Sequence, residues 1–155
     1  MSVRTSVLVL LLAGTPALLA GQHTPTPSCG LIGTWRFVEI VDWDSVGHRL
    51  LYYGAHPGGY LIYTPTGQVS VHITSGKHDP AEAAREPQAS YFGTFTTDQG
   101  CRIVTHQVEG GTIPEYTGTA QPRPFRVSGD SLILGDDRTW RRVLIRVRPA
   151  PPSRP

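Results

Sequence analysis

The chain has 155 residues, of which 17 are glycine and 14 are proline, and its formal net charge is +2. The many helix-breaking residues and the single lysine exclude a coiled coil or long helical bundle. A hydrophobic share of 39% at so low a net charge excludes a wholly disordered chain. The length suits one domain, and the frequent turn residues favour an all-β fold.

The first 20 residues have the pattern of a secretory signal peptide. Arg4 provides a positive N-terminal region, residues 7–13 form an apolar core, and residues 17–20 offer a cleavage site. The apolar stretch is shorter than the roughly 20 residues of a membrane-spanning helix. We therefore expect a secreted or periplasmic protein that has no membrane partner after signal removal, the alternative being an uncleaved anchor. Residues 21–30 are expected to form a linker.

Cys29 and Cys101 are the two cysteines of the chain. In an oxidising compartment an isolated pair is most simply a disulfide, and two free buried thiols are the alternative. A bridge would close a loop of roughly 70 residues and stabilise the fold by about 3–4 kcal/mol through chain entropy. Neither cysteine has a neighbouring His or Lys that would lower its thiol pKa, so neither is expected to be a nucleophile.

Short segments with polar–apolar alternation predict β-strands along the rest of the chain. The expected strands are residues 34–42, 48–53, 60–64, 68–74, 90–97, 101–109, 115–127, 131–135 and 138–147. Pro65-Thr66-Gly67 is a hairpin signal, because Pro presets φ and Gly accepts a positive φ. One short helix is expected near residues 80–86, where Asp79 can cap and Pro80 suits the first helical position.

About eight or nine consecutive strands without a long helix predict a single antiparallel up-and-down β-barrel over residues 31–147. Closing the sheet into a barrel removes its exposed edges, which an open meander would leave unpaired. The proline-rich residues 148–155 are expected to form a disordered tail.

Motifs at both ends of this region point to a known family. Gly33-Thr34-Trp35 opens the first expected strand, and Trp140-Arg141-Arg142 lies in the last. With these, the chain resembles the small bacterial and fungal lipocalin-like domain family over about residues 31–142. The matching segments are 31–36, 59–65, 91–95, 108–109, 118–125, 129–130 and 139–142.

The resemblance implies a lipocalin-like barrel with structural roles for Gly33, Trp35, Trp140, Arg141 and Arg142. In lipocalins an arginine of the last strand packs across the first-strand tryptophan, a cation–π contact worth about 1 kcal/mol. Some lipocalin-like proteins belong to natural-product pathways and are thought to steer cyclisations. Relatives often carry two adjacent histidines where this chain has His106-Gln107, and a tryptophan near the position of Tyr116.

Side-chain alternation along the strands selects candidate interior residues. With Trp35 inward, the same face carries Phe37, Glu39 and Val41. With Phe125 inward, the same face carries Gln121, Arg123 and Val127. Because an inward charge is costly unless it is paired, we expect Glu39 or Glu109 to pair with Arg123 as a polar anchor. Such an anchor in an apolar barrel is typical of a small-molecule pocket, the alternative being a rim salt bridge beside a filled interior.

Three functions are compatible with this pattern. The first is a secreted barrel that binds a small apolar molecule, with ligand-binding candidates Phe37, Tyr63, Phe95, Gln107, Gln121, Arg123 and Phe125. The second is a cofactor-independent isomerase or cyclase that uses the same cavity, with acid–base candidates Glu39, His106, Glu109 and Arg123. The third is a structural or interaction barrel with a filled core. A cavity of several hundred Å³ would favour the first two.

No cofactor, metal or nucleic acid is expected as a partner. The six histidines lack zinc-type spacing, and His106 and Glu109 fall on opposite faces of their expected strand. The low net charge gives no basic surface of the kind that nucleic-acid binding requires. The expected partner is a small hydrophobic molecule.

Overall fold

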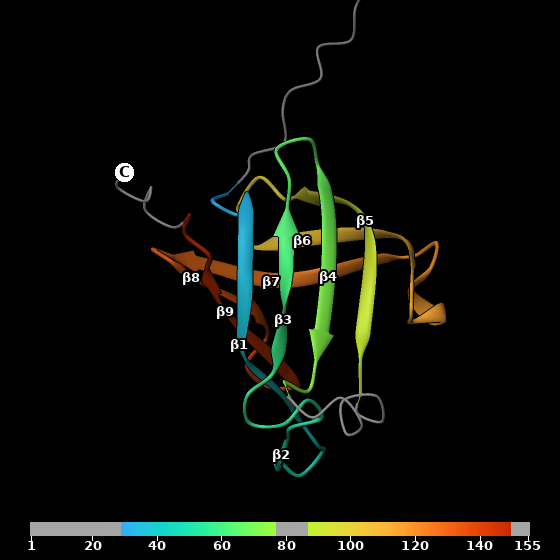
Figure 1. Ribbon diagram of the computed structural model, residues 1–155, viewed down its shortest axis with the longest axis vertical. Helices are drawn as coiled ribbons and strands as arrows, with labels where there is room; N and C mark the ends of the chain where they lie inside the picture. The colour runs from blue at the N-terminus through green and yellow to red at the C-terminus, as the bar shows by residue number, and fades with distance from the viewer. Residues whose placement is uncertain (1–28, 77–86, 150–155) are drawn as a thin grey trace, which may run out of the picture.

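The computed structural model describes residues 29–76 and 87–149, which form an antiparallel sheet (Figure 1). The described elements are β1 (Gly33–Trp43), β2 (Arg49–Leu50), β3 (Gly58–Tyr63), β4 (Gln68–Thr74), β5 (Ala89–Thr97), β6 (Ile103–Gly111), the 3₁₀ helix η1 (Pro114–Tyr116), β7 (Ala120–Ser128), β8 (Ser131–Gly135) and β9 (Trp140–Arg146). The expected signal peptide, most of the linker, the helix near 80–86 and residues 150–155 of the tail lie outside the described residues. No helix within the described ranges has the length and hydrophobicity to cross a bilayer.

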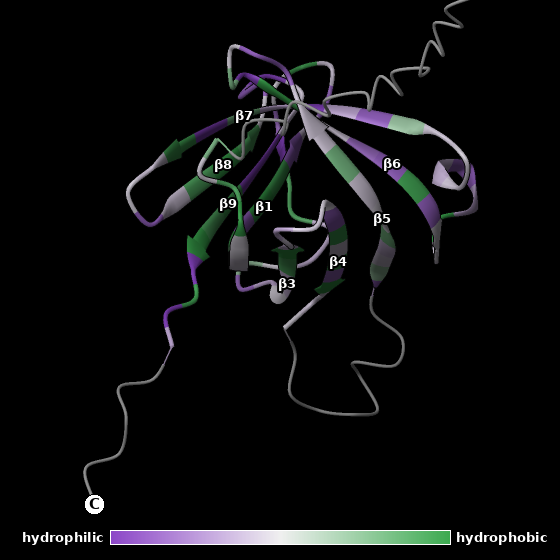
Figure 2. Cartoon of the chain, turned by 90° about the horizontal axis from the view of Figure 1, so that it is seen from above, coloured by the Kyte–Doolittle hydropathy of each residue, from purple (hydrophilic) through white to green (hydrophobic). Residues whose placement is uncertain are grey.

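The strands close into a barrel, as the sequence predicts. Their order is β2-β1-β3-β4-β5-β6-β7-β8-β9, and β9 also pairs with β1, so β1 and β3–β9 form a closed ring of eight. β2 is an extra strand that pairs only with Asp42 and Trp43 at the end of β1. Figure 2 shows the ring from above, with polar and apolar residues alternating along several strands.

Two expected strands are shorter in the structure because turns interrupt them. The strand expected at 48–53 ends at Leu50, since Gly54 donates a backbone hydrogen bond to Leu51 and has a φ of +76°. The strand expected at 115–127 begins only at Ala120. Pro114 starts a 3₁₀ turn before it, which places Tyr116 at the barrel mouth rather than in a strand.

A β-bulge in β1 corrects the expected orientation of Glu39. The register of β1 on β9 shifts between Phe37 and Glu39, which leaves Val38 as an extra residue. Trp35 and Phe37 therefore face the core, but after the bulge Ile40 takes the inward position. Glu39 lies on the outside instead, where it accepts a hydrogen bond of 3.0 Å from Arg141 Nε.

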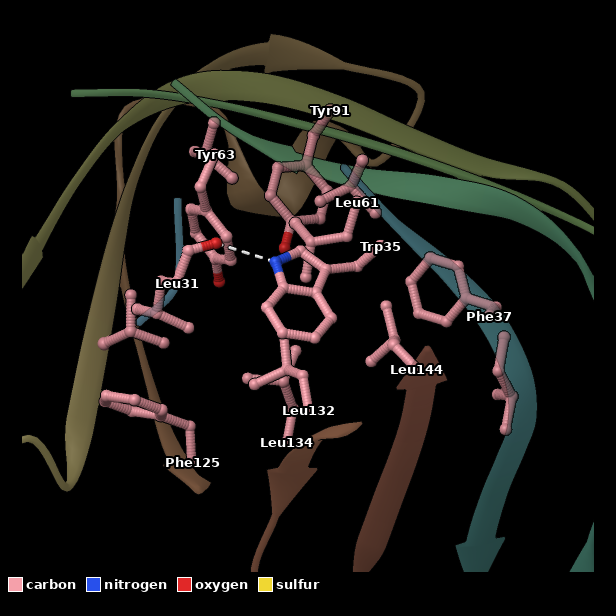
Figure 3. Packing of buried hydrophobic residues seen from close by; sticks show 14 of the residues in the cluster. Leu31, Trp35, Phe37, Leu61, Tyr63, Tyr91, Phe125, Leu132, Leu134 and Leu144 are labelled. Atoms are coloured by element: carbon pink, nitrogen blue, oxygen red, sulfur yellow. Dashed lines mark hydrogen bonds between the residues drawn. The ribbon is translucent and has the colours of Figure 1, made fainter. Parts of the chain in front are cut away.

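The closed end of the barrel is built around Trp35, which is fully buried. Its indole Nε1 donates to the carbonyl of Leu31 at 2.7 Å (Figure 3). The guanidinium of Arg146 lies 4.0 Å from the ring centroid and donates to the carbonyls of Ile32 and Gly30, each at 2.7 Å. The last-strand arginine on this tryptophan is thus Arg146.

Three other residues with expected structural roles stabilise neighbouring parts of the barrel. Arg141 binds Glu39, whereas Arg142 donates to Asp42 Oδ1 at 3.0 Å. Gly33 has a φ of +134°, and a Cβ there would lie 2.8 Å from Arg146 Nη1. Glycine is therefore required at this position both by the backbone and by the packed arginine.

The expected disulfide is present at the closed end. Cys29 and Cys101 are bonded, with Cα atoms 5.5 Å apart and a sequence separation of 72 residues. The bridge ties the segment before β1 to the turn between β5 and β6. We predict that the denatured, unreduced protein shows no reactive thiol and that reductant releases two. Two reactive thiols before reduction would contradict the bridge.

The Arg146 contacts should make a measurable contribution to stability. We expect Arg146→Met to lower the free energy of unfolding by about 2 kcal/mol, because it removes a stacked cation and two charged hydrogen bonds. Arg36→Met, on the exposed outer face of β1, is the matched control and should change it by less than about 0.5 kcal/mol. Urea unfolding followed by tryptophan fluorescence measures both, and equal midpoints would overturn this role for Arg146.

Candidate functional site

A cavity of about 100 Å³ lies at the end of the barrel opposite Trp35. Residues from most strands and from two loops contribute to its wall, so that only a closed barrel forms it. The lining residues are Phe37, Tyr53, Leu61, Val71, Ile73, Ala89, Tyr91, Ile113, Tyr116, Arg123, Leu134, Trp140 and Arg142. The wall is mostly apolar, and its polar side chains are phenols and guanidinium groups.

The structure distributes the expected ligand-binding residues over three places. Phe37 and Arg123 line the cavity. Tyr63, Phe95 and Phe125 belong to the deeper core or pack against it, and the rings of Tyr63 and Phe95 are 4.7 Å apart. The two glutamines are elsewhere, as Gln107 is exposed on β6 and Gln121 is half-buried with its amide nitrogen bonded to Thr119.

The four acid–base candidates do not lie together in the structure. His106 is fully buried on the inward face of β6, whereas Glu109 is exposed on the same strand. Glu39 is outside the barrel, and Arg123 alone of the four lines the cavity. The expected ion pair of Arg123 with Glu39 or Glu109 is therefore wrong, because the bulge in β1 and the alternation of β6 place both carboxylates outside.

Tyrosines 53, 91 and 116 and Trp140 complete the site, although the sequence alone did not predict them as ligand-binding residues. Tyr53 comes from the loop after β2, Tyr91 from β5 and Tyr116 from η1. Only the alternation of β5 could have indicated Tyr91, since it shares a face with Phe95. The other two tyrosines lie in turns, where no periodicity predicts an orientation.

His106 connects two tyrosines beneath the cavity. Its Nε2 is 2.7 Å from the hydroxyl of Tyr63, and its Nδ1 is 2.8 Å from the hydroxyl of Tyr91. Burial, assisted by the charge of Arg123, lowers the pKa of His106 to about 3. The imidazole is therefore neutral at pH 7, with one nitrogen that donates and one that accepts. Burial raises the pKa of both Tyr63 and Tyr91, so both phenols stay protonated.

Arg123 is held by aromatic rings instead of a carboxylate. Its guanidinium carbon lies 5.6 Å from the ring centroid of Trp140 and 5.8 Å from those of Tyr91 and Tyr116. Its Nε is buried and has no hydrogen-bond partner. Within residues 29–76 and 87–149, no carboxylate forms an ion pair with it. The rings stabilise this cation by cation–π interaction.

Arg142, the second arginine of the cavity wall, has its partners within the barrel. It donates to the carbonyl of Val41 at 2.8 Å and to Asp42 Oδ1 at 3.0 Å, while its guanidinium also lies over Trp140. Its charge is thus compensated, and it positions the Trp140 ring. Among the described residues, Arg123 is therefore the one arginine of the cavity wall without an ion pair.

Comparison with known proteins agrees with this architecture. A family model described as a lipocalin-like domain matches residues 32–144, which is most of the barrel. A search of curated proteins found no match.

The buried histidine should make stability depend on pH. Because His106 binds a proton near pH 6.5 in the unfolded chain but only near pH 3 in the folded one, the unfolded state binds more protons between these values. The free energy of unfolding should therefore fall on acidification through this window, with a limiting slope of about 1.4 kcal/mol per pH unit.

Urea unfolding at several values between pH 5 and pH 7 tests this dependence. His106→Gln should show a flatter pH profile than the wild type, whatever its absolute stability. His72→Gln, which alters an exposed histidine of β4, is the control and should keep the wild-type profile. Parallel profiles for His106→Gln and the wild type would assign the pH dependence to other groups.

Proposed function

Since this chain belongs to the lipocalin-like domain family, we propose that it binds a small apolar molecule in the cavity at the open end of its barrel. The observation that carries the proposal is the cavity itself, whose wall combines an apolar lining with a few polar groups. This composition is characteristic of small-molecule sites. The filled closed end around Trp35 limits the site to the opposite half of the barrel.

The size of the cavity restricts the ligand. At about 100 Å³ it is smaller than the several hundred Å³ that would favour a binding or catalytic barrel over a filled one. Apolar cavities of about 150 Å³ accommodate benzene. The site therefore suits one ring or a short branched chain, and a larger molecule would leave its remainder outside the mouth.

The placement of the acid–base candidates favours binding over isomerase or cyclase activity. Glu39 and Glu109 are outside, and His106 is neutral and lies behind Tyr91. No carboxylate lines the cavity among the described residues, so the wall offers hydrogen-bond donors without an evident base.

We also propose that the protein acts outside the cytoplasm. The disulfide between Cys29 and Cys101 supports this location, because such bonds persist mainly in oxidising compartments. The signal-like pattern of residues 1–20 points the same way.

Filling the cavity should abolish binding of a ring-sized probe. We expect fluorobenzene to broaden or shift in ¹⁹F NMR with the wild type, and Val71→Phe to remove the effect, because Val71 is buried and lines the cavity. His72→Phe adds the same side chain on the exposed face of β4 and should bind like the wild type.

Thermal unfolding of each variant checks that it is folded, since overpacking typically costs about 1–3 kcal/mol. No binding to the wild type, or equal binding to a folded Val71→Phe variant, would refute a ring-sized apolar site in this cavity.

A further inference from the structure

We infer that the ligand of this cavity carries a carboxylate, which binds between Arg123 and Tyr91 while its apolar part occupies the remaining cavity. This inference rests on the proposed function and adds the chemical class of the ligand. Three features of the wall support it: a cation without an ion pair, an unpartnered guanidinium N–H and the direction of one phenol proton.

The charge of Arg123 has no counterion in the described part of the barrel. Its neighbours are three aromatic rings, and the other arginine of the wall is already paired with Asp42. Cation–π contacts of this kind each contribute about 0.5–2 kcal/mol. Arg123 is half-buried and has lost part of its hydration, and no carboxylate of the described residues compensates this loss. An anionic ligand would supply the missing charge.

The guanidinium also has an unpartnered donor. Its Nε makes no hydrogen bond within the described residues, although a guanidinium carries five N–H groups in a planar fork. A carboxylate is planar and accepts two such bonds in parallel, which makes it the best geometric match for the fork. A phosphate would need donors for a third oxygen, and the other guanidinium of the wall, that of Arg142, is already bonded to Val41 and Asp42.

The hydrogen bonds around His106 make the hydroxyl of Tyr91 a further donor to the cavity. The hydroxyl of Tyr63 is buried, and among the described residues its partner is His106 Nε2, so the Tyr63 proton is best placed on that bond. Neutral His106 then carries its own proton on Nδ1 and donates it to the oxygen of Tyr91. The proton of Tyr91 is left for an acceptor in the cavity that this tyrosine lines.

The opposite arrangement is less favourable. If Tyr91 donated to Nδ1, then Nε2 would donate to Tyr63 and the buried Tyr63 proton would have no acceptor. An unsatisfied buried donor costs about 1–3 kcal/mol. The interior of the barrel thus orients Tyr91 as a donor towards the same space that Arg123 faces.

These groups define how the ligand would lie. Its carboxylate would accept hydrogen bonds from Arg123 and Tyr91, and its ring or short chain would pack against Phe37, Leu61 and Val71. Small aromatic or branched aliphatic acids satisfy both requirements within a cavity of about 100 Å³.

The test compares three fluorinated single-ring probes by ¹⁹F NMR titration at pH 7: 4-fluorobenzoate, the similarly shaped 4-fluorobenzamide, and fluorobenzene, which lacks the polar group. We expect 4-fluorobenzoate to bind the wild type at least about tenfold more tightly than the amide. Arg123→Gln should weaken 4-fluorobenzoate by about tenfold or more while changing fluorobenzene by less than about threefold. Tyr91→Phe should weaken the acid more than it weakens fluorobenzene.

Arg126→Gln is the matched control. Arg126 is on the same strand but on the exposed face, where it pairs with Asp137 at 2.7 Å. This variant should bind all three probes like the wild type. A shared loss in both arginine variants would show that the acid binds through the general surface charge, which overturns the inference.

The remaining outcomes separate the inference from the proposed function. If fluorobenzene binds and 4-fluorobenzoate has no advantage, or if Arg123→Gln leaves that advantage intact, the cavity binds ligands but the carboxylate inference is wrong. If 4-fluorobenzoate still binds a folded Val71→Phe variant, the acid sits outside the cavity and the inference is also wrong. If no probe binds the wild type, both proposals fail.

Discussion

The closure of the sheet through β1 is the constraint on which the rest of this molecule depends. β1 must pair with β3 at its beginning and with β9 along most of its length, and it meets both demands with a bulge at Val38. The extra residue reverses the alternation, which buries Ile40 and places Glu39 outside. The interior therefore lacks the carboxylate that would have neutralised Arg123, so the charge at the open end follows from the way the barrel closes.

Each end of the barrel has an arginine packed on a tryptophan, but the two arginines differ in their hydrogen bonds. At the closed end Arg146 stacks on Trp35, and two backbone carbonyls occupy its donors. At the open end Arg123 faces Trp140 at 5.6 Å from the ring centroid, and its buried Nε has no hydrogen-bond partner within the described chain. A guanidinium whose donors are bonded to backbone carbonyls stabilises the fold, whereas one with an unpartnered donor is available to bind a ligand. This contrast is what distinguishes a structural arginine from a candidate binding arginine here.

Local patterns predicted the fold better than the site. The Pro65–Gly67 turn and the alternation of β4 are encoded in neighbouring residues, so this hairpin could be predicted directly. The alternation of β6 separates His106 from Glu109 but does not say which of the two faces the interior, and the expected ion pair would put Glu109 there, whereas His106 is the buried residue. The orientation of Glu39 could not be predicted from local patterns, because the bulge arises from pairing with a strand about one hundred residues away. Tyr53 and Tyr116 reach the cavity from turns, and only barrel closure brings them to one space.

Both ends of the described chain leave the barrel on the side of Trp35. Cys29 precedes β1 there, and Val147 donates a backbone hydrogen bond to Thr34 just after β9 (Figure 1). The cavity mouth, formed by the opposite loops, is therefore remote from both points of attachment. A fluorophore, an affinity tag or a sensor surface joined beyond either point would leave the mouth unobstructed, which makes this barrel suited to immobilisation with its binding end facing outward.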